Sequence, residues 1–464
     1  MQRNTPAAPV QTRPALQRVL GLWSAVSIVI GTVIGSGVFL VPSTMIRYLG
    51  SVEKLFVVWI IAGLLSLFGA LTYAELAAAM PEAGGEYVYL SAAYGPFWGY
   101  LYGWTQFWVA KSGSIATLAA GFYTYLTVFY PVLGSTLVTI PLHIGPGGSL
   151  LEIHYGQLVA IGLIAILAAV NYVGVRSGGN LQVAVTIVKM LLIAGVIVVG
   201  LFSGKGDFNH FRAGIPTVGG IAGFFAAMVS ALWAYDGWNN VSMVSSEIRN
   251  PQRNLPRALI FGTAAVIATY LLINISYFYV LNPEQVGVSH RVAADMMRSL
   301  YGGPAASAVA IAVMISILAA LNGSILSGSR VPYAMARDGL FFRTASVVHP
   351  RFHTPGHAMV MLCVWSCVVV LSGWFDDLYN FVIFGSWILY LLTTVSVFVL
   401  RRKLPDLPRP YRTIGYPVVP VLFICVAALL LISTLQTRPR ESLMGLALMA
   451  LSIPFYLHWK KRNL

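Results

Sequence analysis

The sequence predicts an all-α membrane protein with twelve transmembrane helices, because its residues are largely apolar and the apolar residues occur in long runs. Of its 464 residues, 58% are hydrophobic and only 9% are charged, whereas soluble domains carry about 25% charged residues. A span needs roughly 20 apolar residues, and lipid offers the backbone no hydrogen-bond partners. Such runs must therefore form helices that satisfy their own backbone.

Twelve stretches of the chain are long enough to span a membrane. They begin near Trp23, Leu55, Phe97, Gln157, Val183, Gly219, Ile260, Ala305, Ala358, Phe381, Val418 and Leu443. Residues 1–17 precede them and contain three prolines among small and polar residues, so we expect a disordered tail there. Residues 18–464 are predicted to form a single transmembrane domain.

Three connecting segments are long enough to have a character of their own. The segment from Pro131 to Tyr155 has no Lys or Arg and is expected to be an outer loop with Gly-Pro turns. Asn282 to Tyr301 mixes apolar and charged residues, as a short amphipathic helix on the outer surface would. Arg401 to Tyr416 has five basic residues and three prolines and is predicted to be a cytoplasmic linker.

The net charge of +14 reflects membrane topology rather than nucleic-acid binding. If the N-terminus is cytoplasmic and the spans alternate, 19 of the 29 Lys and Arg residues lie on the cytoplasmic side and 8 on the outer side. The remaining two, Lys111 and Lys189, fall inside spans. Cytoplasmic loops are enriched in basic residues, so both termini are predicted to be cytoplasmic.

Helix-breaking sequence interrupts the first and the sixth span. The first interruption runs from Gly31 to Gly37 and the second from Trp233 to Asn240. Each glycine costs about 1 kcal/mol in a helix interior. The two spans are equivalent if the first ten form two five-helix repeats, and paired interruptions then indicate a binding site at mid-membrane. Alternatively, Gly31 and Gly35 form a packing face for another helix.

An unwound helix suits a ligand that has both a carboxylate and an ammonium group. The N-terminus of a half-helix carries about half a positive charge. The amides of Gly35, Ser36 and Gly37 are open to close approach by a carboxylate, because these residues have small side chains or none. The break in the sixth span frees backbone carbonyls, which suit an ammonium. An amino acid carries both groups.

Three segments together resemble a known family. Gly31 to Phe39 is similar to the first-helix signature of the amino acid–polyamine–organocation (APC) superfamily. Trp233 to Asn239 with Glu247 to Pro256, and Leu321 to Gly339, resemble its L-type amino acid transporter branch. The resemblance implies a LeuT-like fold: two five-helix repeats of inverted topology, with the first and sixth helices unwound, followed by two C-terminal helices. Repeat one would span about 20–205, repeat two about 215–403, and helices eleven and twelve about 415–460.

The resemblance also implies roles for residues at the two breaks. The amides of Ile34, Gly35, Ser36 and Gly37 would hold the substrate carboxylate. The carbonyls of Trp233, Ala234 and Tyr235 would hold the amino group, with Asp236 and Gly237 beside them and Trp233, Asn239 and Asn240 as gating residues. Many eukaryotic members bond a heavy chain through a cysteine after the third span. The segment 131–155 has no cysteine, so we expect no such partner, as in prokaryotic homologues. The protein is accordingly expected in the inner cell membrane.

Charged residues within the spans are candidate functional groups, since a lysine at membrane depth costs about 2.5 kcal/mol or more. The resemblance places Lys189 where sodium-coupled relatives bind an ion, so we hypothesise that it replaces that ion; the alternative is that it reaches the cytoplasmic interface. Lys111, with Ser112 and Ser114, either lines the side-chain pocket or pairs with a carbonyl or an acid. Asp236 either balances a cationic substrate or caps the second half-helix.

Other polar residues are assigned structural roles. Glu75, Glu82 and Glu86 are expected to be solvated at the cytoplasmic interface, with ion pairs to the arginine-rich side as the alternative. Cys363, Cys367 and Cys425 are taken as small buried hydrophobic residues. Pro350 and Pro355 prevent a regular helix through His349, His353 and His357, so no metal site is predicted. No cofactor or catalytic motif is present.

The leading hypothesis is sodium-independent exchange of neutral L-amino acids by alternating access. Without a nucleotide-binding loop, a gradient rather than ATP would drive transport. Two alternatives remain: a proton-coupled amino acid or polyamine transporter of the same fold, and a sensor that binds amino acids without transporting them. The glycine-rich break counts against polyamines, which lack a carboxylate.

Overall fold

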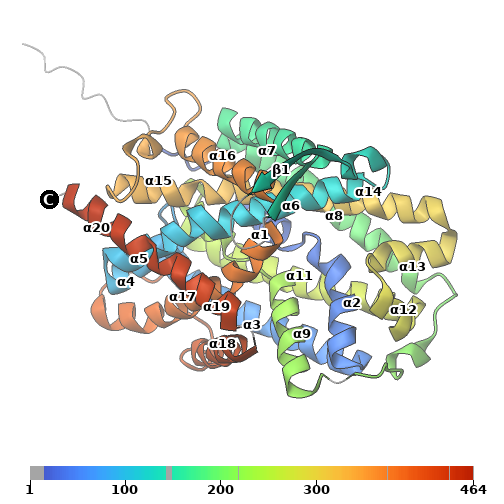
Figure 1. Ribbon diagram of the computed structural model, residues 1–464. Coiled ribbons are helices and arrows are strands. Elements are labelled where there is room, and N and C mark those ends of the chain that lie inside the picture. The colour runs from blue at the N-terminus through green and yellow to red at the C-terminus, as the bar shows by residue number, and fades with distance from the viewer. Residues whose placement is uncertain (1–14, 143–148, 218, 374, 438, 463–464) are drawn as a thin grey trace, which may run out of the picture.

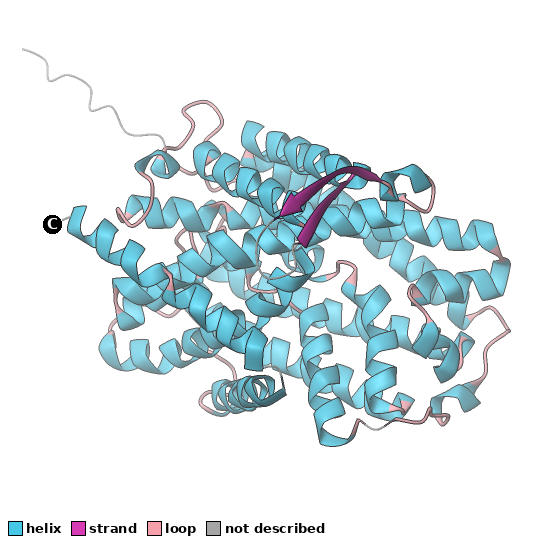
Figure 2. Cartoon of the chain, in the orientation of Figure 1, coloured by secondary structure: helices cyan, strands magenta, loops and turns pink. Residues whose placement is uncertain are grey.

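The computed structural model describes the chain apart from residues 1–14, 143–148, 218, 374, 438 and 463–464. Most of the expected N-terminal tail therefore lies outside the described residues. Most of the described residues are helical, and one two-stranded hairpin accompanies the helices (Figures 1 and 2).

The first half of the chain contains the first break and the hairpin. Its elements are α1 (Leu22–Val33), α2 (Gly37–Leu49), α3 (Val52–Ala79), α4 (Glu86–Tyr94), α5 (Pro96–Thr105), a π-helical turn (Gln106–Ala110), α6 (Lys111–Leu126), β1 (Thr136–Leu142), β2 (Ser149–His154), α7 (Tyr155–Val173) and α8 (Val175–Leu201).

The second half contains the second break and the C-terminal helices. Its helices are α9 (Gly220–Ala234), α10 (Asn240–Met243), α11 (Pro251–Val280), α12 (Pro283–Val288), α13 (Val292–Tyr301), α14 (Gly303–Gly328), α15 (Arg330–Arg337), α16 (Gly356–Ser372), α17 (Phe375–Lys403), α18 (Val418–Thr437), α19 (Pro439–Ala450) and α20 (Ser452–Arg462). Short 3-10 turns at 131–134, 208–211, 245–247 and 343–346 connect them.

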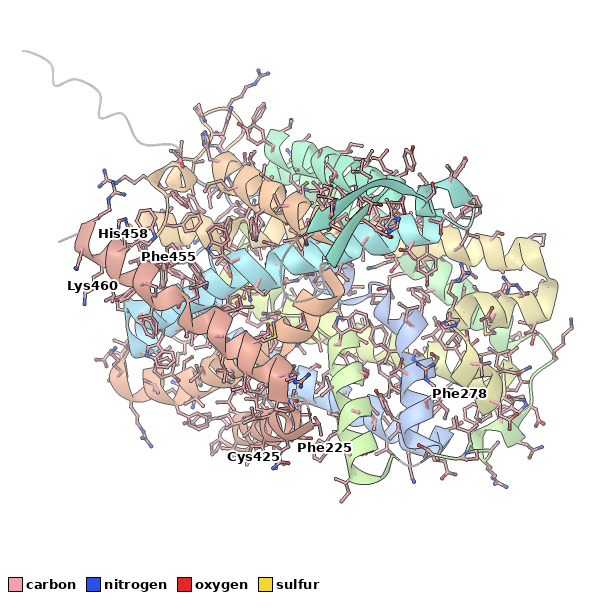
Figure 3. All side chains as sticks on the ribbon, in the orientation of Figure 1. Phe225, Phe278, Cys425, Phe455, His458 and Lys460 are labelled. Carbon is pink, nitrogen blue, oxygen red and sulfur yellow. The ribbon has the colours of Figure 1, made fainter. Side chains whose placement is uncertain are left out.

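Many of these helices are built to cross a membrane. Among the described residues, eight are long and apolar enough to do so, and a ninth span arises if the bent pair α1 and α2 counts as one. Their outward faces carry exposed apolar side chains, which lipid can cover. On α20, Figure 3 shows Phe455 before His458 and Lys460, so the basic residues lie at the end of the helix nearest the C-terminus.

Both interruptions expected from the sequence coincide with helix ends. Helix α1 stops at Val33 and α2 starts at Gly37, with a bend of 40° between them. Helix α9 stops at Ala234, and the four-residue α10 starts only at Asn240. Helix α2 packs beside α9 (Figure 1), and α11 packs on α1, α3 and α8. The two broken segments therefore lie next to each other against a continuous scaffold.

The connecting segments are more ordered than their sequences suggest. Strands β1 and β2 pair antiparallel, with Thr139 opposite Glu152 and Ile140 opposite Leu151, where an irregular loop was expected. The segment 282–301 forms two helices, α12 and α13, rather than one. The buried apolar residues of α13 include Val292, Met296 and Leu300, so α13 packs into the protein through one face.

The prediction that Glu75 and Glu86 are solvated at the interface is wrong, because both side chains are buried. Glu75 is 2% exposed and pairs with Arg401 at 2.7 Å. The backbone N–H of Thr413 donates to Glu75 at 2.7 Å and its hydroxyl donates at 2.8 Å. Glu75 thus fastens the linker before α18 to α3. Only Glu82, of the three acidic residues, is exposed.

A second buried ion pair joins α15 to the segment that follows α10. Glu247 and Arg330 are both 0% exposed, and three nitrogen–oxygen distances of 2.9–3.1 Å connect them. The backbone of the same segment pairs with Leu20, two residues before α1. The N–H of Leu20 donates to the carbonyl of Glu247 at 2.9 Å, and the N–H of Arg249 donates to the carbonyl of Leu20 at 2.8 Å. These contacts tie the start of the first span to the end of the sixth.

Candidate functional site

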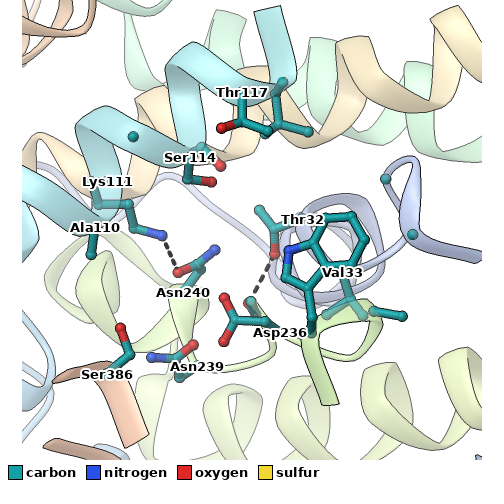
Figure 4. Close-up of a pocket in the computed structure, with 18 of the residues that line it drawn as sticks. Thr32, Val33, Ala110, Lys111, Ser114, Thr117, Asp236, Asn239, Asn240 and Ser386 are labelled. Atoms are coloured by element: carbon teal, nitrogen blue, oxygen red, sulfur yellow. Dashed lines mark hydrogen bonds between the residues drawn. The ribbon is translucent and has the colours of Figure 1, made fainter. Parts of the chain in front are cut away.

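A cavity of about 110 Å³ lies between the two broken segments (Figure 4). Its walls come from α1 and α2 on one side, from α9 and α10 on another, and from α6, α14 and α17. The lining residues are Thr32, Val33, Gly35, Ser36, Gly37, Gln106, Ala110, Lys111, Gly113, Ser114, Thr117, Leu118, Leu232, Trp233, Ala234, Asp236, Gly237, Asn239, Asn240, Met243, Ser324, Ser386, Trp387 and Tyr390. The lining is rich in hydroxyl and amide side chains, which suits a small polar ligand.

Only part of the first break has amides available to a ligand. The N–H of Ile34 donates to the carbonyl of Ile30 at 3.0 Å, and the N–H of Gly35 donates to that of Val33 at 2.9 Å. The amides of Ser36 and Gly37 make no backbone hydrogen bond within the described part of the chain. They lie at the N-terminus of the 13-residue α2, where the helix dipole favours an anion.

The two breaks are joined directly by side chains. The hydroxyl oxygen of Thr32 lies 2.9 Å from the carbonyl oxygen of Gly237 and 2.7 Å from that of Ile28, and the contact with Gly237 is drawn in Figure 4. The hydroxyl of Tyr270, on α11, lies 3.1 Å from the carbonyl oxygen of Val33 and 2.7 Å from that of Ala234. The two breaks are therefore in hydrogen-bond contact with each other and with α11.

The glycines of the first break serve two different purposes. A Cβ atom on Gly31 would lie 1.9 Å from the side-chain nitrogen of Gln182, so Gly31 is a close packing contact with α8. A Cβ atom on Gly37 would lie 3.0 Å from the Cα atom of Ala234, which brings the break in the first span against the break in the sixth. The packing alternative therefore holds for Gly31, whereas Gly35 and Gly37 line the cavity.

Lys189 reaches the first break from α8. It is 0% exposed, and its amine donates to the carbonyl of Gly31 at 2.9 Å and to that of Ile34 at 2.6 Å. The alternative in which it extends to the interface is wrong. The hydroxyl of Ser316, on α14, also donates to the carbonyl of Ile34, at 2.9 Å. Three helices thus meet at the carbonyl groups that the break sets free.

A buried polar network lies at the other end of the cavity. The amine of Lys111 donates to the side-chain oxygen of Asn240, as Figure 4 shows. The amide of Asn239 donates to Glu86, which also accepts from Tyr102 at 2.9 Å. Lys111 lines the cavity, and its hydrogen-bond partner is the side-chain carbonyl oxygen of Asn240 rather than an acid.

Asp236 presents its carboxylate to the cavity. The side chain is exposed although it lies at the level of the breaks, because the cavity adjoins it. One carboxylate oxygen accepts from the hydroxyl of Tyr390 at 2.7 Å. The residue in the N-cap position of α10 is Asn239, while the carboxylate of Asp236 also accepts from the backbone N–H of Gly237, an amide freed by the second break. Its position leaves it accessible to a ligand.

Most of the residues predicted to bind substrate line this cavity, and three do not. The backbone of Ile34 faces Lys189 and Ser316. The hydroxyl of Tyr235 donates to the carbonyl of Trp59 at 3.3 Å, and that of Ser112 to the carbonyl of Phe107. Sequence reasoning missed Gln106, Ser324, Ser386, Trp387 and Tyr390. These residues lie on spans three, eight and ten, where no interruption marked them.

The described residues include no group of three or more His, Cys, Asp or Glu side chains placed to hold a metal ion. What the fold and the cavity define is a helical membrane protein with a polar ligand site between two broken helices.

The chain belongs to the amino acid permease family, whose model matches residues 20–451. The serine/threonine exchanger SteT of Bacillus subtilis is 33% identical over 453 residues, covering 97% of this chain and 98% of that protein. The b(0,+)-type amino acid transporter 1 of mouse is 31% identical over 442 residues, covering 94% and 86%. The human cystine/glutamate transporter is 29% identical over 459 residues, covering 98% and 88%.

Proposed function

We propose that this protein is a sodium-independent exchanger of neutral L-amino acids that works by alternating access. The observation that carries the proposal is the position of the cavity, which lies between the free amides of Ser36 and Gly37 and the carbonyl ends of α9. An α-carboxylate fits the first group. An α-ammonium fits the second through the remaining lone pairs of the Trp233 and Ala234 carbonyls, which already accept from the N–H of Asp236 and the hydroxyl of Tyr270. The named activities of the full-length relatives, among them a serine/threonine exchanger, support an amino acid as the substrate.

The proposed architecture has twelve spans, ten of them in two inverted five-helix repeats. Each predicted apolar stretch corresponds to a helix or to a pair of consecutive helices. The pairs are α1 with α2, α5 with α6, α9 with α10, and α19 with α20. In this arrangement the unwound first and sixth spans are equivalent members of the two repeats. The transmembrane domain would comprise residues 18–464 and lie in the inner cell membrane, with both termini in the cytoplasm.

Lys189 takes the place of an ion in this proposal. A sodium ion would supply positive charge to the carbonyl oxygens freed by the first break, and the amine of Lys189 already donates to two of them. Exchange then needs no ion, since the site is held together by a covalently attached donor. The three cysteines of the chain are Cys363, Cys367 and Cys425. Their positions within spans, away from 131–155, support a protein that has no disulfide-linked heavy chain.

The side-chain end of the cavity favours small polar substrates. Trp233, which lines the cavity beside Gly37, limits the length of a side chain, and we propose it as a gate with Asn239 and Asn240. Lys111 and Asn240 donate and accept hydrogen bonds, and Asp236 adds a carboxylate to the cavity wall. A hydroxyl group on the substrate suits these polar residues better than a long apolar side chain does. It can hydrogen-bond to polar atoms that lose their bonds to water when the substrate binds.

The experiment that tests this proposal is trans-stimulation with a panel of substrates. Liposomes containing the purified protein are loaded with radiolabelled L-serine. Efflux of the label is then followed with each unlabelled compound supplied outside. We expect L-serine, L-threonine and L-alanine to accelerate efflux by about tenfold or more over D-serine and over putrescine, which lacks a carboxylate. Equal acceleration by putrescine would contradict recognition of the carboxylate by the first break.

A further inference from the structure

A second cavity, of about 340 Å³, opens at the start of α11, away from the site between the two breaks. Residues from two parts of the chain line it: the first three turns of α11 and the linker before α18. The lining residues are Gln252, Arg253, Pro256, Arg257, Ile260, Phe261, Pro410 and Tyr411. Two of these eight are arginines and none is acidic, so the cavity has a strongly positive charge.

The charges of the two arginines have no partner among the described residues. Neither Arg253 nor Arg257 makes a side-chain hydrogen bond or an ion pair with the residues that the structure describes. They are four positions apart in the sequence, so both lie on one face of α11, where like charges repel each other. An anion placed between them relieves that repulsion. Two guanidinium groups on one face suit a phosphate group, to which arginine binds with paired hydrogen bonds.

The same face of α11 continues into the membrane as an apolar surface. Phe261 lies four residues beyond Arg257, roughly 12 Å along the helix from Arg253, and is 60% exposed. Ile260 lines the cavity beside it. On this face of α11 the charged residues come first and the apolar residues follow toward the membrane interior. This order matches a phospholipid, whose phosphate lies at the interface and whose acyl chains extend into the membrane.

The wall opposite α11 is held in place before any ligand binds. Glu75 accepts from the backbone N–H and the hydroxyl of Thr413 and pairs with Arg401, and Arg409 lies 3.5 Å from it. Pro410 and Tyr411 lie between these anchored positions. A cavity with a fixed wall loses less freedom when a ligand enters it.

We propose that the start of α11 and residues 410–411 form a binding site for the phosphate group of an anionic phospholipid. The bilayer supplies this ligand at high local concentration on the side of the protein where basic residues gather. Bound lipid would hold the end of α11, the helix whose Tyr270 contacts both breaks. Its occupancy is therefore expected to increase the transport rate, a consequence that rests on the proposed exchange function.

The test is native mass spectrometry of the full-length protein after exchange into phosphatidylglycerol or phosphatidylcholine. We expect the protein to retain phosphatidylglycerol, and R253Q/R257Q to retain about tenfold less because both phosphate donors are lost. The control R343Q/R402Q removes the same charge from two exposed arginines elsewhere and should behave as the wild type does. R253K/R257K, which keeps the charge but not the paired hydrogen bonds, should retain an intermediate amount.

Three outcomes would overturn the proposal. These are equal retention by R253Q/R257Q and the control, equal retention of phosphatidylcholine, and displacement of phosphatidylglycerol by millimolar inorganic phosphate, which would point to a site for the free anion. Lipid retention is read without any transport assay. A protein that retains the lipid but transports no amino acid would contradict the proposed exchange function and still support the lipid site.

Discussion

Replacing Lys189 with methionine is expected to lower amino acid transport by about tenfold or more, although methionine nearly preserves the volume of the side chain. The amine of Lys189 donates to the carbonyls of Gly31 and Ile34, and it is fully buried. A buried acceptor that loses its donor costs about 1 to 3 kcal/mol, and about 1.4 kcal/mol corresponds to a factor of ten. The carbonyl of Ile34 keeps the hydroxyl of Ser316 as a donor. The loss of the amine therefore affects the carbonyl of Gly31 more.

The measurement is initial uptake of labelled L-serine into loaded liposomes, normalised to the amount of correctly folded protein by size-exclusion chromatography. Lys205→Met is the matched control. The amine of Lys205 also donates to one carbonyl, that of Leu300, at 2.9 Å, but its side chain is exposed outside the spans. We expect that variant to transport at the wild-type rate. Unchanged rate and affinity in Lys189→Met would refute the role of Lys189 at the break.

Replacing Arg330 with methionine is expected to lower the free energy of unfolding by about 3 to 5 kcal/mol, because it leaves the carboxylate of Glu247 buried without its partner. Both side chains are 0% exposed. Arg330 also donates to the carbonyl of Leu326 and, at 2.8 Å, to the hydroxyl of Ser329. The loss should be measured by denaturant unfolding of the protein in detergent, with tryptophan fluorescence as the signal.

The double variant E247L/R330M distinguishes a buried unpaired charge from lost packing. Removing both charges of a buried pair is often close to neutral, so the double variant should be more stable than Arg330→Met alone. Arg298→Met is the control, since the pair of Arg298 and Asp295 is 61% and 37% exposed and exposed pairs contribute about 0 to 1 kcal/mol. A loss of similar size in Arg298→Met and Arg330→Met would contradict this explanation.

The sequence alone predicts the helical membrane class and the positions of both breaks, because each rests on local information. Apolar runs mark the spans, and the clusters of glycine and polar residues at 31–37 and 233–240 mark the points where α1 and α9 stop. The hairpin of β1 and β2 was not predicted, because the Gly and Pro residues of the segment 131–155 are typical of turns and lie among the strand-forming residues of Thr136–Leu142 and Ser149–His154.

The polar contacts between spans could not be predicted, since they depend on how distant helices pack. The position of Glu75 near the end of α3 is compatible with solvent or with a buried partner, and only the folded linker places Thr413 and Arg401 against it. The same holds for Tyr390, which reaches Asp236 from α17. Thr32 lies inside the predicted break, but its contact with Gly237 requires the two breaks to be adjacent.

The measurement that tests most directly whether the site between the breaks performs exchange is counterflow in sodium-free liposomes. Labelled L-serine is supplied outside vesicles whose lumen is either empty or loaded with unlabelled L-serine, with and without an imposed proton gradient. Exchange predicts uptake only into loaded vesicles, independent of the proton gradient. Uptake into empty vesicles driven by the proton gradient would contradict exchange and identify a proton-coupled transporter. The absence of uptake into either kind of vesicle would contradict transport itself.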